Sequence, residues 1–496
     1  MRHQNIFFAL LLLNIPYTQL KAQDARGAAD PSGTTNIGAT LGLQQCVAIA
    51  IKNNLTVNQS DIALQQNRIQ LTQAWDNMLP SINANASQNI GFGRSLITSS
   101  YTYTDAQTTS GSYGLNAGLT LFNGLRIQNN IRANTFFYKS SQLDLQQQKD
   151  NITLTVLLDY LAILAAEDVL GIAHEQADID KRQLDRLEIQ NREGALLLLT
   201  NLSDLRGQYA SDLANIAVDS NIAESAKITL FNVLNVPYKR NVDYDRNAFT
   251  LDITDYTQAP DSIYATALST QPMIRSNDLK VMGYRRALSV ARGAYYPNLS
   301  FGVNVNSYYS NAAAPNVTPT GVFQDLPTGQ IVTVGGTNYN VIDPHQELVN
   351  LSTATWGDQF KNNRQTSLGL TLNIPILNQL QVRNNVKQAK VTLRNSELNA
   401  NSVRLVLQQN VESAYQNMIA AYKTYKADID AAGAFAESFR TQQIRFDEGV
   451  ITSDVYVQAK NRSDAAQVNL SQAKYTYIFR TKVLDYYQGR LTWTTK

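Results

Sequence analysis

The chain repeats itself over most of its length. Early residues match residues 217 positions later, as Pro80 matches Pro297, and from Asn123 and Asn378 onward the offset is 255 with no further gap. The difference of 38 residues therefore belongs to one insertion between Pro297 and Asn378. A long internal repeat with one change of length implies two copies of one structural unit.

Each copy begins with a helical pattern, over residues 43–79 and 263–296, that ends at a proline. Proline ends a helix because it lacks the amide donor and clashes with the preceding turn. The hydrophobic period then changes from that of a helix to that of a strand. Two alternating segments follow in each copy, which predicts β-hairpins over 80–122 and 297–377. Their apolar positions include Ile82, Ala84, Leu115, Ala117, Leu119, Leu299, Phe301, Val303, Leu368, Leu370 and Leu372.

The alternating segments suit a wall between lipid and water. We expect strands of about 9–11 residues, the length that crosses a bilayer when tilted. A soluble antiparallel sheet with one buried face gives the same alternation and is commoner. The membrane interpretation is favoured because nothing nearby in the sequence resembles a core that these strands could cover.

A very long helix follows each hairpin. Residues 126–193 and 381–448 each give 68 positions without a proline, or roughly 100 Å of helix at 1.5 Å per residue. Leu158, Ala165 and Ile172 lie seven positions apart, which predicts coiled-coil packing against neighbouring helices. No compact globular domain accommodates such a rod.

The two long helices end at the same Glu-Gly pair, which contains Gly194 and Gly449. Glycine just past a helix end supplies the left-handed backbone that a tight reversal requires. Return helices are expected over 195–234 and 450–488. The predicted organisation is a first repeat over 41–235, a polar linker over 236–260 with strand-like fragments, and a second repeat over 261–489.

The N-terminal pattern of a short basic stretch and an eight-residue apolar run predicts a signal peptide over residues 1–22. No other segment approaches a transmembrane helix, so membrane insertion would have to use β-structure. The only cysteine, Cys46, is not at the cleavage site, which argues against a lipid anchor and a disulfide framework. A net charge of +2 argues against a nucleic-acid partner.

Four membrane strands cannot close a barrel alone. An open edge in lipid would leave backbone groups unpaired at several kilocalories per mole each. The chain must therefore assemble with copies of itself, and a closed ring is the expected solution.

This order of helix, proline, hairpin, long helix and Glu-Gly tip, given twice, resembles the TolC family of outer-membrane efflux and secretion channels. The strongest matches are residues 296–299, 372–378 and 448–459. The resemblance implies a mostly α fold with membrane β: a tandem-repeat protomer of a homotrimer, with a 12-stranded outer-membrane β-barrel built from four strands per chain. A long periplasmic α-helical coiled-coil barrel would continue it.

The resemblance also implies a function and a location. The protein would be the outer-membrane exit duct of a tripartite efflux pump or type I secretion system, conducting substrates passively. Its partners would be a periplasmic adaptor, an inner-membrane pump or ABC exporter, and outer-membrane lipid. The competing hypothesis is a periplasmic coiled-coil adaptor or helical scaffold without a channel, which leaves the repeated position of the hairpins unexplained.

Site residues carried over from the family lie at the two tips. Expected adaptor-docking residues are Gly194, Leu196, Leu197, Gly449, Val450 and Ile451. The alternative for the leucines is packing against a neighbouring helix pair. Asp454 is the candidate pore gate, because family members often carry acidic rings after the second tip, although a carboxylate near a helix N-terminus is also favoured by the dipole alone.

No catalytic, metal-binding or cofactor-binding constellation is found, so an enzyme is not expected. The histidines lack the spacing of metal ligands. The loop over about 310–364 carries the insertion and is expected to face the exterior. Tyr308, Tyr309 and Trp356 are candidates for an aromatic girdle, with exposed loop aromatics as the simpler alternative.

Overall fold

The computed structural model describes residues 40–97, 102–193, 199–246, 256, 258–312, 317–350 and 354–490. These residues form two compact units. The helical unit draws on residues up to Gln65, Ser140–Ser276 and residues from Ala400 onward, and the strand unit comprises Gln66–Lys139 and Asn277–Asn399. The predicted signal peptide and the tip residues Gly194, Leu196 and Leu197 lie outside the described residues.

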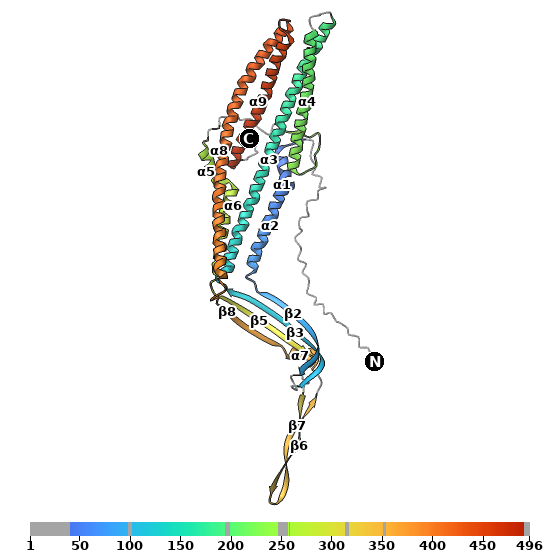
Figure 1. Cartoon of the computed structure of the whole chain (residues 1–496), viewed down its shortest axis with the longest axis vertical. Helices are drawn as coiled ribbons and strands as arrows, with labels where there is room; N and C mark the ends of the chain where they lie inside the picture. Colours follow the sequence, from blue (N-terminus) through green and yellow to red (C-terminus); the bar gives the residue numbers. More distant parts are fainter. Residues whose placement is uncertain are drawn as a thin grey trace, which may run out of the picture. The chain divides into compact units, whose positions relative to one another are not determined.

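Two long helices, α3 (Arg126–Arg192) and α8 (Gln381–Asp447), each have 67 residues and contribute to both units. In the helical unit, α4 (Leu199–Leu234) runs along α3, and α9 (Ser453–Tyr487) runs along α8 (Figure 1). The tandem pattern of long helix and shorter return helix is therefore present in both copies, as expected.

The helix that opens each copy is broken, and the prediction of one continuous helix is wrong. The first copy has α1 (Leu43–Asn53) and α2 (Leu55–Asp76), and the second has α5 (Pro260–Thr270) and α6 (Pro272–Gly293). The breaks fall at Asn54 and Gln271, which are 217 positions apart and have extended backbones. Asn54 Oδ1 accepts from Thr56 N at 2.9 Å and so starts the next helix. Gln271 precedes a proline, which disfavours the helical backbone.

The buried seam of α3 differs from the predicted heptad. Positions such as Val156, Tyr160 and Ile163 are fully buried, whereas Leu158 and Ala165 are only half-buried. Leu158 nevertheless packs against the buried core of the helical unit, so the predicted heptad takes part in packing within the chain without forming all of its fully buried centre.

Four antiparallel strands form the main sheet of the strand unit, in the order β2-β3-β5-β8 (Figure 1). They are β2 (Ser81–Ile97), β3 (Thr102–Phe122), β5 (Asn298–Ser310) and β8 (Gln365–Asn373). Strands β2 and β3, at 17 and 21 residues, are longer than the predicted 9–11. Backbone pairing of β2 with β3 continues past the segment of alternating apolar residues, through residues that are mostly polar.

The register of this sheet places every predicted apolar position on one face. Ala117 pairs with Ile82 on one side and Val303 on the other, and Val303 pairs with Leu368. Directly paired residues share a face. The opposite face is polar, and Asn116 Nδ2 donates to Asn85 Oδ1 there at 2.9 Å.

The apolar face is exposed. Leu368, Leu370 and Ile82 are each about two-thirds exposed, at 69%, 66% and 67%. No core of the described residues covers them, so the soluble-sheet alternative lacks its buried side. An uncovered apolar face of this size marks a surface that contacts lipid or another protein.

The 38-residue insertion forms a second, two-stranded sheet. Strands β6 (Val317–Val334) and β7 (Thr337–Asn350) pair antiparallel, and α7 (Trp356–Asn362) follows. Trp356 packs edge-on against Tyr113 of β3 at 5.7 Å between ring centroids and donates from Nε1 to the Tyr113 hydroxyl at 3.0 Å. Trp356 therefore packs on β3 while about half of its surface stays exposed, and its part in an aromatic girdle stays a prediction.

In the helical unit, the linker contributes β4 (Asp243–Tyr244), which pairs in parallel with β1 (Thr40–Leu41). The Tyr160 hydroxyl donates to Leu41 O at 3.0 Å and fixes this pair against α3. The strand-like fragment predicted at 249–253 lies outside the described residues. Among the described helices, none combines the length and hydropathy needed to cross a membrane.

Candidate functional site

The second helical tip is a hydrogen-bonded reversal between α8 and α9. Gly449 has φ +74°, the left-handed backbone expected after a helix end. Gly449 N donates to Phe446 O at 3.0 Å, and Val450 N donates to Arg445 O at 2.9 Å. These two bonds satisfy the last carbonyls of α8 and reverse the chain into α9.

The predicted docking residues of this tip differ in exposure. Val450 is 61% exposed, whereas Ile451 is half-buried and packs against a small core. That core contains Leu184, Leu187, Leu202, Leu205, Phe446 and Tyr456. Of the described tip residues, Val450 therefore offers the free apolar surface, and Ile451 supports the turn. The docking assignment stays a prediction.

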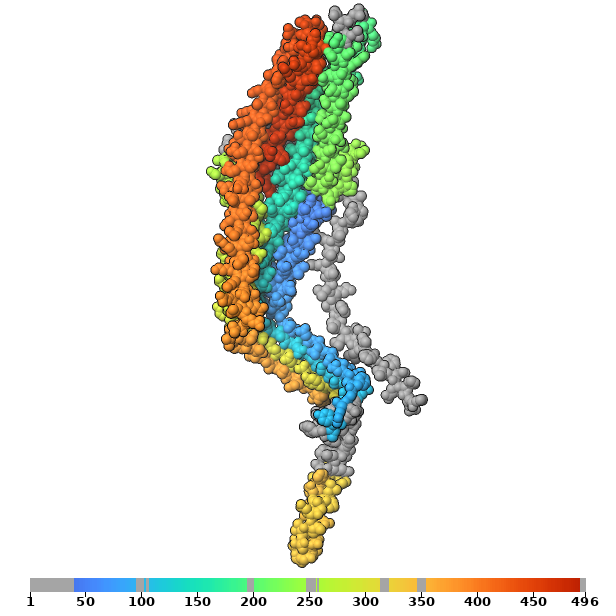
Figure 2. Space-filling model, viewed as in Figure 1, coloured from blue at the N-terminus to red at the C-terminus, as the bar shows by residue number. Residues whose placement is uncertain are grey.

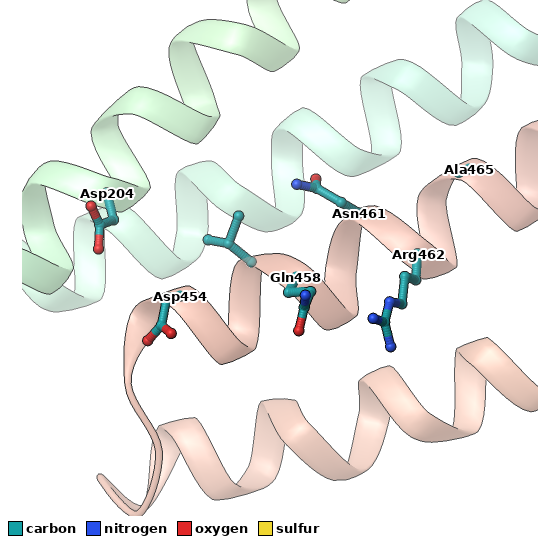
Figure 3. A pocket seen from close by; sticks show the side chains of 7 residues that line it. Asp204, Asp454, Gln458, Asn461, Arg462 and Ala465 are labelled. Atoms are coloured by element: carbon teal, nitrogen blue, oxygen red, sulfur yellow. The ribbon is translucent and has the colours of Figure 1, made fainter.

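Asp454 lies in the first turn of α9 and lines a groove of about 630 Å³ (Figure 3). Asp204 of α4 and Gln458, Asn461 and Arg462 of α9 also line it. The Thr452 hydroxyl donates to Asp454, and this hydrogen bond holds the pKa of the fully exposed carboxyl below its usual range. Asp454 is thus ionised at neutral pH, as a charged gate requires.

Asp204 joins the two return helices beside this groove. Its Oδ2 accepts from the Ser453 hydroxyl at 2.6 Å, and the neighbouring Asn201 Oδ1 accepts from Ser453 N at 3.3 Å. Ser453 is the first residue of α9 and is 2% exposed. Side chains of α4 therefore cap the start of α9 and position Asp454 one residue later.

A second link joins α3 to the end of α8. Arg186 Nη1 lies 2.6 Å from Asp447 Oδ1, and Gln183 Nε2 donates to the same oxygen at 2.7 Å. Asp447 is the last residue of α8. Both ends of the second tip are thus held by residues of the first repeat.

Two turns beyond the tip, Lys460 of α9 is completely buried among three carboxylates. Its Nζ lies 3.2 Å from Asp180 Oδ2 on α3, 3.2 Å from Asp212 Oδ2 on α4 and 2.6 Å from Asp464 Oδ2 on α9. We call Lys460, Asp180, Asp212 and Asp464 the buried ion cluster. One cation therefore ties α9 to both helices of the first repeat.

The buried ion cluster holds more acid than base. Three ionised carboxylates around one ammonium would leave two uncompensated negative charges in a site with little water, which is costly. Burial, opposed by the attraction of Lys460 and assisted by the nearby Asp212, raises the pKa of Asp180 to about 7. Burial also raises the pKa of Asp464. The cluster therefore retains a proton in the folded state at a pH where an exposed aspartate is ionised.

This proton makes stability depend on pH. Between about pH 4 and pH 7 the unfolded chain releases the Asp180 proton while the folded helices keep it, so this contribution to stability is lost as the pH rises. The urea midpoint, followed by helical circular dichroism, should fall between about pH 4 and pH 7, and we expect Asp180→Asn to make this fall shallower. Asp430→Asn, at an exposed site on α8, should leave the slope as in the parent. An unchanged slope in Asp180→Asn would contradict the assignment.

Sequence reasoning missed Asp204 and the buried ion cluster. The repeat itself contained a signal, because Lys460 stands 255 positions after Leu205, a residue that is completely buried. A lysine at the equivalent of a core leucine needs a buried partner. No spacing in the sequence pointed to Asp180 and Asp212, which come from two other helices.

One protein family matches both copies of the repeat. The sequence profile described as outer membrane efflux protein matches residues 47–236 and again residues 263–482, once for each copy. The chain belongs to the outer membrane efflux protein family. The resemblance to the TolC family, inferred from the Glu-Gly tips and the hairpins, is therefore confirmed. The predicted tandem-repeat fold class is confirmed as well.

Relatives within the family are distant in sequence. The outer membrane protein TolC of Salmonella enteritidis is 23% identical over 402 residues, which cover 76% of this chain and 74% of TolC. The outer membrane efflux protein BepC of Brucella suis biovar 1 is 21% identical over 477 residues, covering 90% and 91%. The crystal structure of CusC superposes with a TM-score of 0.70 at 16% identity, covering 90% of this chain and 91% of CusC.

Proposed function

We propose that this protein is an outer-membrane exit duct that conducts substrates passively across the periplasm and outer membrane. The observation that carries the proposal is the β2-β3-β5-β8 sheet, which is apolar on one exposed face and polar on the other. Such a sheet separates lipid from a water-filled lumen. Family membership and the paired long helices support the same function.

The duct is a homotrimer with 12 strands. Strands β2 and β8 are the edges of the sheet, and β8 is exposed along its whole length. Open edges cannot persist in lipid, so β8 of one copy pairs with β2 of the next until the ring closes. Ala165 and Ile172 of α3 are half-buried within one copy, and they supply part of the surface for helices of neighbouring copies.

The partners are a periplasmic adaptor and an inner-membrane pump or ABC exporter, which supply the energy. The adaptor docks at the two tips, through Gly194, Leu196 and Leu197 in the first and Gly449, Val450 and Ile451 in the second. The exposed Val450 supports this surface. Asp454 gates the pore, because an ionised carboxylate repeated in three copies would ring the narrow end of the tunnel with negative charge.

The test is the mass and single-channel conductance of the detergent-extracted mature protein in a planar bilayer. We expect a trimer with discrete, cation-preferring conductance. Asp454→Asn should raise the conductance and lower the cation preference several-fold, because the ring loses its charge.

The control for the gate is Asp430→Asn, which removes another exposed negative charge, on α8 and 24 positions before Asp454. It should leave conductance and selectivity as in the parent. A water-soluble monomer without conductance would refute the duct. A conducting trimer in which both variants behave alike would refute the gate only.

A further inference from the structure

Strands β6 and β7 form a ribbon that the exit-duct function leaves unexplained. We call residues 317–350 the insertion ribbon. The side chains of residues 321–345 are exposed almost throughout, and Figure 2 shows the yellow part of the ribbon without covering atoms on the face drawn. An isolated two-stranded ribbon is at best marginally stable in water. A further surface is therefore needed to keep these strands ordered.

The distal half of the insertion ribbon has one apolar face. Val332 pairs with Tyr339 and Val334 pairs with Thr337, so these four residues share a face. Val332, Val334 and Tyr339 are 50%, 63% and 58% exposed. On the opposite face, the Thr333 hydroxyl donates to Asn338 Oδ1 at 2.6 Å. The apolar face thus has a large exposed area, and the opposite face is mainly polar.

The charge pattern narrows the choice of partner. Residues 326–342 contain no Asp, Glu, Lys, Arg or His, and residues 311–360 contain no Lys or Arg. Anionic lipid head groups are recognised by clusters of Lys and Arg, so a lipid surface does not match this segment. An uncharged apolar face instead fits an identical face, because no charge has to be desolvated when two copies meet.

The place of the ribbon in the chain makes a second copy the available partner. It lies in the connection between β5 and β8, and β8 is the edge strand that meets the next copy in the trimer. The ribbons of three copies are therefore tethered close to the junctions between subunits. Tethering gives an effective concentration in the millimolar range for short links, so even a small apolar face can associate.

We propose that the insertion ribbons of the three subunits pack against one another through the face formed by Val332, Val334 and Tyr339. The inference rests on the trimeric duct proposed above. Each ribbon buries these side chains against the same residues of another copy. This contact supplies the further surface that a two-stranded ribbon needs to stay ordered. The insertion is therefore a subunit contact additional to the strand edges and the helices.

Cysteine crosslinking in intact cells tests this contact. Val334→Cys places a thiol on the apolar face, and Thr333→Cys places one on the opposite face of the same strand, as a matched control. The native Cys46 is completely buried, and burial raises the pKa of its thiol to about 12, so it contributes little background. With a short bismaleimide, which joins two thiols, and one reactive thiol per subunit, we expect Val334→Cys to give a dimer-mass product at least tenfold more abundant than that of Thr333→Cys.

The mass of each variant in detergent, measured without crosslinker, separates the two proposals. Trimers of both variants with selective linkage at position 334 support the ribbon contact. Trimers with no linkage, equal linkage of both variants, or linkage of position 334 to a different protein would overturn it and leave the duct standing. Monomers of both variants would overturn the trimer and, with it, the ribbon contact.

Discussion

Replacing Leu370 by arginine is expected to prevent assembly of the protein in the outer membrane. Leu370 is 66% exposed in the middle of β8, on the apolar face of the sheet. An arginine on the lipid face of a membrane strand costs about 2–4 kcal/mol at the bilayer midplane. Because a trimer carries three copies, the total penalty is about 6–12 kcal/mol. Folded trimer in the outer-membrane fraction should therefore fall at least tenfold, measured by heat-modifiable migration on gels.

Thr371→Arg is the control for the lipid-facing assignment. Thr371 follows Leu370 in the same strand and pairs with Ser300 on the polar face. A charge there faces the lumen, where substitutions change selectivity more than stability. We expect trimer yields close to the parent. Equal losses in the two variants would show that the apolar face does not contact lipid.

Replacing Lys460 by methionine is expected to destabilise the helical unit by about 3–5 kcal/mol, because it leaves three buried carboxylates without their cation. Methionine keeps the length of the apolar stem, so packing changes little. Lys460 is 0% exposed and is the contact common to Asp180, Asp212 and Asp464. The measurement is the guanidinium midpoint of the detergent-extracted protein, followed by helical circular dichroism.

Two variants decide whether charge causes the loss. Arg462→Met removes a cation from an exposed site on the same helix and should change stability by no more than about 0.5 kcal/mol. Adding Asp180→Asn and Asp212→Asn to Lys460→Met should restore much of the stability, since the uncompensated charges are then largely removed. If Lys460→Met behaves like Arg462→Met, the buried ion cluster does not hold these helices together.

The strand faces were predictable because alternation is a local property. In a strand, successive side chains point to opposite faces, so Phe301, Val303 and Leu370 could be assigned to one face before any pairing was known. The left-handed Gly449 was predictable for the same reason, because glycine after a helix end is a local requirement. The half-buried state of Ile451 was not, since it depends on which helices surround the turn.

The insertion shows another limit of local patterns. Its prolines and glycines favoured a loop, yet residues 317–350 form a paired ribbon, and Trp356 packs on Tyr113, more than 240 positions earlier in the chain. Such pairings depend on contacts between distant segments, which composition does not reveal. Breaks at Asn54 and Gln271 were also missed, although the proline after Gln271 was a local signal.

The sequence by itself determined the two-copy organisation, the order of helix, hairpin and long helix in each copy, the two faces of the sheet and the family. These follow from hydrophobic periodicity, which is a property of residues close together in the chain, and from the internal repeat, which is a match at a constant offset. Only the tertiary structure decided which stripe of α3 is buried, which side chains hold the second tip, and that Lys460 lies among three carboxylates. Those features are set by side chains from separate helices, and their energies arise from burial and charge that exist only once the helices have packed.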